Sequence, residues 1–254
     1  MASFAINFYS KEMDHHVDVT VMIPDTAPVD NIPVLWLLHG MTGDHTGWIR
    51  NTCIERYSKK YGIAVVCPSA ENSYYCDMVY GKKFYSFVTR ELVDYMRRIF
   101  RFSEKREDNY IAGLSMGGYG ALRIALLNPE QYCATAPLSG VLDIVSSLSH
   151  CSWSGIARNI WGERFAETVK GSDNDIFHIA ETFPEDKEKP YVFVACGNND
   201  FLLGQNKDAV AKLYECGFHI DYMEGEGEHN WDFWDPWINV AIGEMFKNTG
   251  REVK

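Results

Sequence analysis

The spacing of apolar residues divides the chain into strand-like and helix-like segments. In residues 15–24, HHVDVTVMIP, apolar side chains alternate with polar ones, which is typical of a strand with one buried face. We expect this strand to pair antiparallel with a strand in residues 2–9. Residues 33–40 (PVLWLLHG) and 63–69 (IAVVCPS) are instead continuously apolar and end in turn-forming residues. Such runs are typical of parallel strands that are buried on both faces.

Helix-like segments separate the strands. Apolar residues at helical spacing predict one helix over residues 47–60 and another from Phe84 to Ile99. The remaining predicted strands are 109–115, 132–140, 190–200 and 218–224, and the remaining predicted helices are 116–128, 203–216 and 237–248. Pro236 is suited to the first turn of the last helix. This alternation predicts an α/β fold with a mostly parallel central sheet and helices on both faces.

Residues 141–189 interrupt the alternation. They contain several aromatic residues but show weak periodicity, so we expect a small cap or lid inserted between two core strands. No linker-like stretch divides the chain, and 254 residues lie within the range of one large α/β domain. We therefore predict a single domain over residues 1–254, with the cap at approximately 141–189.

Composition narrows the classes of function. The chain is 46% hydrophobic, which is ample for a packed core, and its net charge of −11 argues against nucleic acid or an anionic membrane as the main partner. The seven cysteines form no CxxC pair and no zinc-type spacing, which fits a reducing compartment and predicts no metal site. No signal-peptide pattern and no apolar run of about 20 residues is present, so we expect a cytoplasmic protein.

Residues 113–117, GLSMG, carry the strongest chemical signal. They match Gly-x-Ser-x-Gly and lie directly between a predicted strand and a predicted helix, which is the setting of a nucleophile elbow. In that turn the serine backbone is strained, and Gly113 and Gly117 relieve the crowding around Ser115. A glycine-rich phosphate loop is the alternative, but the chain has neither of the usual phosphate-binding patterns there. We predict that Ser115 is a nucleophile.

A serine hydroxyl at its ordinary pKa needs a base, which in this kind of fold follows the serine in the chain. His229 lies in a glycine-bearing loop after the last predicted strand, so it is our candidate. His150 and His178 lie in the predicted cap, and His219 lies at the wrong end of a strand. A surface-loop histidine is the alternative interpretation of His229.

The base needs an acid to orient it. Asp200 directly follows a predicted strand and is our candidate, with a helix N-cap as its alternative role. Asp143 follows the preceding strand and is the rival. Asp221 and Asp232 are less well placed.

An oxyanion also needs backbone donors. We predict the amide of Met116, the residue after the nucleophile, and the amide of Met41 in the HGMTG loop at 39–43. His39 braces this loop in our interpretation. Candidate pocket residues are Trp48, Trp153 and Trp161, for each of which plain packing is the alternative.

Four motifs in one order, HGMTG, GLSMGGYGALR, GNNDF and GEHNWDFW, resemble the bacterial tributyrin-esterase group, which is related to esterase D and S-formylglutathione hydrolase. The resemblance runs from about residue 33 onward. It implies an α/β-hydrolase fold, a Ser115–His229–Asp200 triad and hydrolysis of short-chain acyl esters without a cofactor. Relatives also include enzymes that remove acetyl or cinnamoyl groups from plant polysaccharides. S-formylglutathione hydrolases typically have HGLTC where this chain has Gly43.

These observations predict a serine carboxylesterase that acts on a small-molecule ester. Acetyl or feruloyl esterase activity and S-formylglutathione hydrolysis are alternatives within the same chemistry. Acyl transfer to an alcohol and a non-catalytic binding role remain as further hypotheses. The sequence leaves the formation of a homo-oligomer open.

Overall fold

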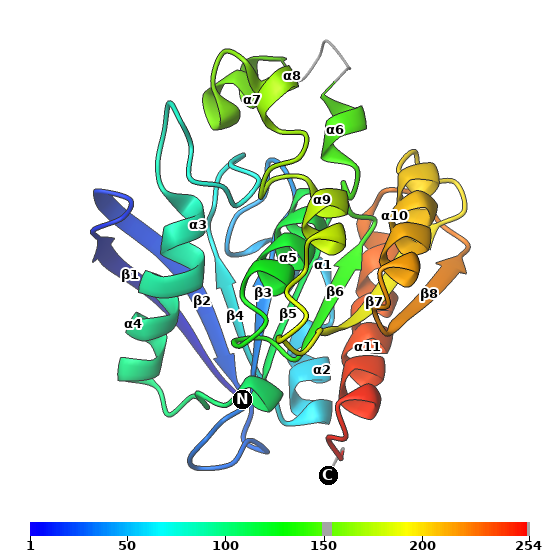
Figure 1. Cartoon of the computed structure of the whole chain (residues 1–254). Helices are drawn as coiled ribbons and strands as arrows, with labels where there is room; N and C mark the ends of the chain where they lie inside the picture. Colours follow the sequence, from blue (N-terminus) through cyan, green and yellow to red (C-terminus); the bar gives the residue numbers. More distant parts are fainter. Residues whose placement is uncertain (149–153, 253–254) are drawn as a thin grey trace.

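A single mixed sheet forms the centre of the computed structural model, which describes residues 1–148 and 154–252 (Figure 1). Within these ranges the sheet has eight strands in the order β1-β2-β4-β3-β5-β6-β7-β8. The strands are β1 Ala2–Ser10, β2 His15–Ile23, β3 Val34–Leu38, β4 Ala64–Pro68, β5 Asn109–Leu114, β6 Ala134–Leu138, β7 Tyr191–Gly197 and β8 Ile220–Gly225. β2 pairs antiparallel with β1 and with β4, and the other pairs are parallel. The predicted sheet is confirmed.

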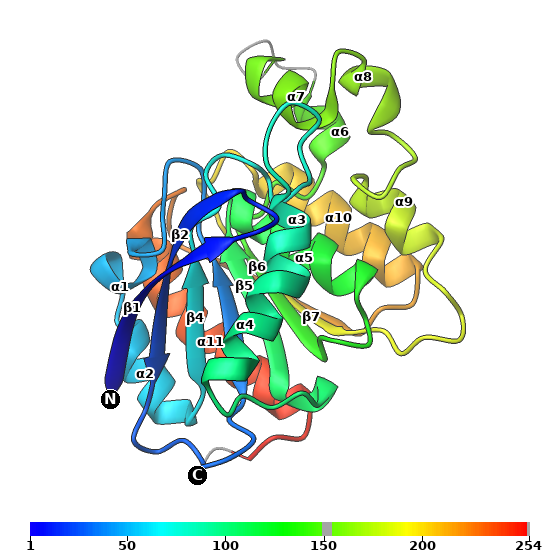
Figure 2. The ribbon, with the colours of Figure 1, turned by 90° about the vertical axis from the view of Figure 1, so that its left-hand side faces the viewer.

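Helices cover both faces of the sheet, as Figures 1 and 2 show. One layer contains α3 Phe84–Ser86, a π-helical turn Phe87–Glu91, α4 Leu92–Ile99, α5 Met116–Leu127, α9 Ile176–Glu181 and α10 Leu203–Glu215. The other contains α1 Gly47–Asn51, α2 Ile54–Tyr61 and α11 Trp231–Asn248. A short 3-10 helix, Arg106–Asp108, precedes β5. Within the described residues, none of the helices is both long and apolar enough to cross a bilayer.

The central strands explain why the sheet needs both layers. Every residue of β3 is buried, and alternate side chains enter different cores. Trp36 and Leu38 pack into the core under α4 and α5, whereas Leu35 and Leu37 pack into the core under α2 and α11. Because successive side chains of a strand point to opposite faces, a continuously apolar run is stable only when both faces are covered.

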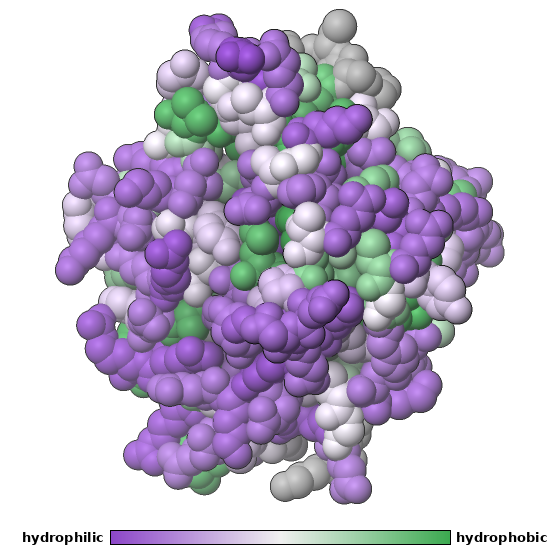
Figure 3. Space-filling view, viewed as in Figure 1, coloured by the Kyte–Doolittle hydropathy of each residue, from purple (hydrophilic) through white to green (hydrophobic). Residues whose placement is uncertain are grey.

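The segment between β6 and β7 divides into two parts. α6 Ile144–Ser147, α7 Ser154–Trp161 and α8 Phe165–Thr168 lie beyond the carboxyl ends of the parallel strands, at the top of Figure 1. α9 instead packs against α5 and α10 and belongs to the helix layer. Of the predicted cap at 141–189, only α6, α7 and α8 therefore lie over this end of the sheet, and their role as a cap stays a prediction. The face seen in Figure 3 is largely hydrophilic, with small apolar patches.

Two predicted helices differ from the structure. The helix predicted over 47–60 is two helices, because Thr52 is extended and the Asp235 carboxylate accepts the Cys53 amide at 2.7 Å. The last helix begins at Trp231, where the Asn230 side chain caps it, and not at residue 237. Pro236 therefore lies inside α11, so its predicted place in the first turn is wrong.

Candidate active site

Ser115 occupies a strained turn between β5 and α5. Its backbone has φ 53° and ψ −117°, a conformation that is costly for a residue with a side chain. The turn is held on both sides, because the Ser115 amide donates to the Leu138 carbonyl at 2.9 Å and the Ser115 carbonyl accepts the Tyr119 amide at 3.1 Å. This geometry presents the Ser115 hydroxyl at the carboxyl end of the sheet, at the N-terminus of α5.

The flanking glycines make this turn sterically feasible. A Cβ atom on Gly113 would lie 2.4 Å from the Gly117 carbonyl oxygen, and one on Gly117 would lie 2.5 Å from the Leu38 carbonyl oxygen. Both distances involve backbone atoms, which have little freedom to move away. The prediction that these two glycines relieve crowding around Ser115 is confirmed by these contacts.

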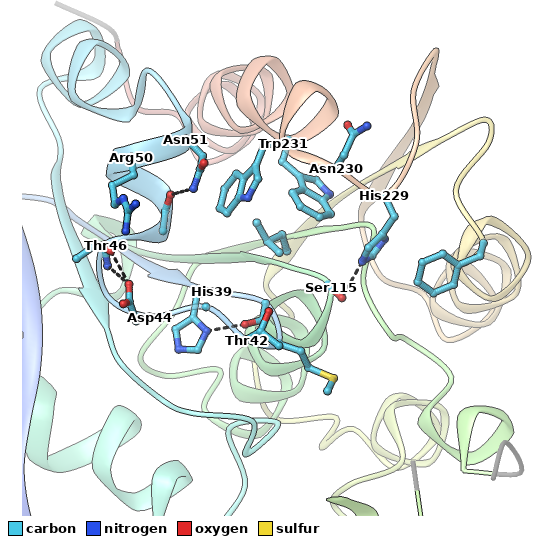
Figure 4. Close-up of a pocket in the computed structure, with 17 residues that line it drawn as sticks. His39, Thr42, Asp44, Thr46, Arg50, Asn51, Ser115, His229, Asn230 and Trp231 are labelled. Atoms are coloured by element: carbon cyan, nitrogen blue, oxygen red, sulfur yellow. Dashed lines mark hydrogen bonds between the residues drawn. The ribbon is translucent and has the colours of Figure 1, made fainter. Parts of the chain in front are cut away.

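Three predicted side chains meet at this point although they are far apart in the sequence; Figure 4 shows two of them, Ser115 and His229. His229 Nε2 lies 2.9 Å from Ser115 Oγ, and His229 Nδ1 lies 2.9 Å from Asp200 Oδ2. Because a carboxylate only accepts hydrogen bonds, Nδ1 carries the proton and Nε2 can accept the Ser115 hydroxyl. The three elements that contribute are the β5–α5 turn, the loop after β7 and the loop after β8.

Asp200 is held in its ionised form. Its side chain is fully buried, whereas the His229 side chain is 19% exposed. Burial would raise the pKa of Asp200, but hydrogen bonds from His229, from the Leu202 amide and from Ser139 outweigh it and lower the pKa below its ordinary value. The Leu202 amide donates to Asp200 Oδ1 at 2.8 Å. A buried carboxylate with these donors is suited to orienting an imidazole.

The structure places the rival acids away from this arrangement. Asp143 caps α6, where its side chain accepts the Ser146 amide at 2.9 Å. Asp221 accepts the Tyr191 hydroxyl at 2.8 Å within β8, and Asp232 is exposed in the first turn of α11.

The rival histidines are also elsewhere. His178 lies in α9, and His219 precedes β8, where its ring packs against Tyr191. His150 lies outside the described residues.

The amides of Met41 and Met116 are available as donors. Met116 is the first residue of α5, and the first amides of a helix have no partner within the helix. Among the hydrogen bonds of the described residues, none has either amide as its donor. Met41 lines the same cavity as Ser115. The partial positive charge of a helix N-terminus also favours an anion beside Met116.

His39 braces the loop that carries Met41. Its Nδ1 lies 2.7 Å from the Gly40 carbonyl, and its Nε2 accepts the Ala70 amide at 2.9 Å. The ring is 1% exposed, and burial lowers its pKa against the opposing effect of the Gly40 hydrogen bond. These contacts confirm the prediction that His39 braces the loop at 39–43. The structure adds that His39 does so as a neutral bridge to the loop after β4.

A cavity of about 660 Å³ opens beside Ser115 and His229. Its aromatic lining comes from Phe201, Trp231 and Trp234. The Phe201 ring lies 4.6 Å from the His229 ring, and the Trp234 ring stands edge-on to the imidazole at 4.9 Å. Sequence reasoning missed these three as cavity residues, although each is within five positions of Asp200 or His229 in the chain.

The tryptophans predicted to line the pocket do not do so in the described residues. Trp48 is fully buried behind the cavity, where its indole donates to the Leu38 carbonyl at 3.0 Å and its ring packs edge-on against Trp231. Trp161 lies in the cap and packs against Tyr74. Trp153 lies outside the described residues.

Comparisons with known proteins show the family to which the chain belongs. The esterase family model, described as "Putative esterase", matches residues 10–245. The acetyl esterase of Caldicellulosiruptor saccharolyticus is 33% identical over an alignment 265 residues long, gaps included, which covers 97% of this chain and 99% of that protein.

Two solved structures from Staphylococcus aureus are similar over nearly the whole chain. The fluorophosphonate-binding serine hydrolase F, in a substrate-bound structure, has a TM-score of 0.88 and 33% identity, with 96% of this chain and 98% of that chain covered. An S-formylglutathione hydrolase has a TM-score of 0.82 and 32% identity, with the same coverage. The chain therefore belongs to this esterase family, has the α/β-hydrolase fold and is a carboxylic ester hydrolase of the serine hydrolase type.

Proposed function

We propose that the chain hydrolyses short-chain acyl esters through a Ser115–His229–Asp200 triad. The observation that carries the proposal is the chain of two 2.9 Å contacts from Ser115 Oγ through His229 to the buried Asp200, at the wall of an open cavity. Nucleophile, base and orienting acid are in hydrogen-bond reach of one another, which is the arrangement that activates an otherwise weakly nucleophilic hydroxyl.

In the proposed reaction, Ser115 Oγ attacks the ester carbonyl carbon while its proton passes to His229 Nε2. The amides of Met41 and Met116 stabilise the resulting oxyanion. The tetrahedral intermediate collapses, the carbon–oxygen bond to the alcohol breaks, and the alcohol leaves with the proton from His229. A water molecule then gives a proton to His229 and attacks the acyl-enzyme, which releases the acid and restores Ser115. Asp200 stabilises the imidazolium in both steps.

A short acyl group is the proposed preference. It is supported by the 33% identity to a protein named acetyl esterase over almost the full length of both chains. S-formylglutathione hydrolysis is a second candidate, favoured by the 32% identity to an S-formylglutathione hydrolase. Gly43, where such enzymes typically have cysteine, weighs against it.

Two measurements test the proposal. A fluorophosphonate probe should label the wild-type protein once, on the peptide that contains Ser115, and should not label Ser115→Ala. Hydrolysis of p-nitrophenyl esters from acetate to octanoate, with methyl ferulate and S-formylglutathione alongside, should give its highest kcat/KM among the shortest acyl chains. Label on a different residue, or full activity in Ser115→Ala, would contradict the proposed triad. Activity confined to S-formylglutathione would contradict only the proposed substrate.

A further inference from the structure

The cavity beside Ser115 has a second polar wall, formed by α1 and the loop before it. Arg50 and Asn51, at the end of α1, line the same cavity as Ser115 and His229. Figure 4 shows them on the opposite side of Trp231 from His229. A substrate that fills the cavity from Ser115 therefore reaches these two side chains. Neither belongs to the proposed triad or to the proposed oxyanion donors.

Among the described residues that line the cavity, Arg50 is the one whose side chain carries a permanent positive charge. Its side chain is exposed, and in the described part of the chain it forms no ion pair, side-chain hydrogen bond or ring contact. Five other exposed or partly exposed arginines have carboxylate partners, namely Arg101, Arg106, Arg158, Arg164 and Arg251. Four more have no ion pair within the described part of the chain, namely Arg56, Arg90, Arg97 and Arg98, and these do not line the cavity. Arg50 thus differs from them by its place in the cavity lining.

The carboxylate on the same wall does not neutralise this charge. Asp44 Oδ1 accepts the Thr46 amide at 2.7 Å and the Thr46 hydroxyl at 2.6 Å. These two hydrogen bonds hold one carboxylate oxygen of Asp44 against Thr46, two residues further along the chain. Among the described residues, no hydrogen bond or ion pair joins Asp44 to Arg50. Arg50 therefore retains its planar set of N–H donors, which matches the two oxygens of a carboxylate.

We propose that Arg50 forms a subsite for a carboxylate group carried by the substrate, on the part of the ester that extends from Ser115 past Trp231. The preferred substrates are then small esters that bear a negative charge distant from the scissile bond. This inference rests on the proposed function, because it takes Ser115 as the point at which the ester is held. Asn51, beside Arg50, supplies a polar group at the same end of the cavity.

The experiment compares two phenyl acetates that differ mainly in charge. 4-Acetoxybenzoate carries a carboxylate, and 4-acetoxybenzamide is its neutral counterpart of similar shape. We measure kcat/KM for both with the wild-type protein and with Arg50→Met, Arg50→Lys, Asp44→Asn and Arg90→Met. Arg90 is the matched control, because it is exposed, lies in the π-helical turn before α4 and does not line the cavity. A second pair, 3-(4-acetoxyphenyl)propionate and its amide, places the carboxylate or amide group farther from the scissile ester bond.

For at least one pair, Arg50→Met should lower kcat/KM for the carboxylate about tenfold, mainly through KM, because a hydrogen bond to a charged group is lost. With the amide as substrate, kcat/KM should change less than twofold. The preference is the ratio of kcat/KM for the carboxylate to kcat/KM for the amide. Arg50→Lys should retain part of this preference, and Asp44→Asn should increase it. In the wild type, 0.5 M salt should reduce it. Arg90→Met should resemble the wild type.

Equal effects of Arg50→Met on the carboxylate and the amide in both pairs would overturn the subsite. An equal loss in Arg90→Met would also overturn it, because the preference would then follow net charge. Failure of the proposed function gives a different result, because Ser115→Ala would then still hydrolyse the amide-bearing acetate.

Discussion

The indole N–H of Trp234 donates a hydrogen bond to Ser139 Oγ at 3.2 Å, and both side chains are buried beside the proposed active site. Ser139 is one of the groups whose hydrogen bonds lower the pKa of Asp200. It has a positive φ of 45°, and its amide donates to the Ala195 carbonyl at 2.8 Å. Trp234 also contacts the His229 ring edge-on. Trp234 and Ser139 thus form a support behind Asp200 and His229.

We expect Ser139→Ala to lower kcat about tenfold for a p-nitrophenyl ester, with little change in KM. The substitution removes one stabilising partner of the Asp200 carboxylate, so Asp200 orients His229 less firmly. Because Ser139 does not line the cavity, substrate binding should be preserved. Steady-state kinetics separates the two parameters.

Trp234→Phe should change kcat in the same direction, because it keeps a ring beside His229 but removes the N–H that orients Ser139. The matched control is Trp237→Phe, one turn further along α11, where the indole packs against the Phe193 and Phe233 rings. If Trp237→Phe lowered kcat as much as Trp234→Phe, general damage to α11 would explain both effects, and the positioning role of Trp234 would be wrong.

Asp200 and Asp143 provide a direct test of the proposed acid. Asp200→Asn should lower kcat by about 10³–10⁴-fold, because an amide in place of the carboxylate no longer stabilises the imidazolium or fixes its tautomer. Asp143→Asn should stay within about threefold of the wild type, because asparagine also caps helices well. The esterase assay on both variants, after circular dichroism confirms folding, decides between the two carboxylates. The reverse order of effects would assign the acid to Asp143.

Local patterns were sufficient to predict the features that depend on neighbouring residues. Continuous apolar runs identified the buried parallel strands, and the glycines around Ser115 identified the strained turn, because both signals reflect steric demands within a few residues. The positions of His229 and Asp200 beside Ser115 could be predicted because the order of strands determines which loops lie at the same edge of the sheet.

Two of the errors came from contacts between distant segments. The helix predicted over 47–60 is interrupted where Asp235, far along the chain, accepts the Cys53 amide. Trp48 was expected in the pocket, but Trp231 lies between it and the cavity. Pro236 suggested a helix start because a proline is usual there, whereas Asn230 caps the helix earlier. The first two relationships are not encoded in local spacing, whereas the Asn230 cap, which accepts the Phe233 amide, is a local signal that was missed.

The packing around Gly117 predicts a large and specific loss of stability. Gly117→Ala would place a methyl group 2.5 Å from the Leu38 carbonyl and 2.6 Å from the His39 carbonyl. We expect the free energy of unfolding to fall by about 3 kcal/mol, and Tm by roughly 6–12 °C, because backbone atoms of β3 have to move. Gly155→Ala in α7 is the control, since among the described residues no atom outside its chain neighbours and the backbone of its own helix lies within 4 Å of the added carbon. Its Tm should be unchanged or slightly higher. Equal shifts for both variants would contradict the steric explanation.

His39 should make the stability of the protein depend on pH. Burial lowers the pKa of His39 in the folded state below its ordinary value of about 6.5. Below that ordinary value the unfolded chain binds a proton that the folded protein does not, so stability decreases as the pH falls towards the folded-state pKa. Across this range the wild type should lose up to about 1.4 kcal/mol per pH unit through His39.

His39→Gln removes this titration. At pH 8 the variant should be less stable than the wild type by about 1–3 kcal/mol, because the hydrogen bonds to Gly40 and Ala70 are lost or weakened. Chemical denaturation between pH 8 and pH 5.5 should then show the two stability curves converging as the pH falls, since only the wild type bears the cost of keeping His39 neutral. Parallel curves over the whole range would mean that His39 is protonated in the folded protein as readily as in the unfolded chain, and its role as a neutral bridge would be wrong.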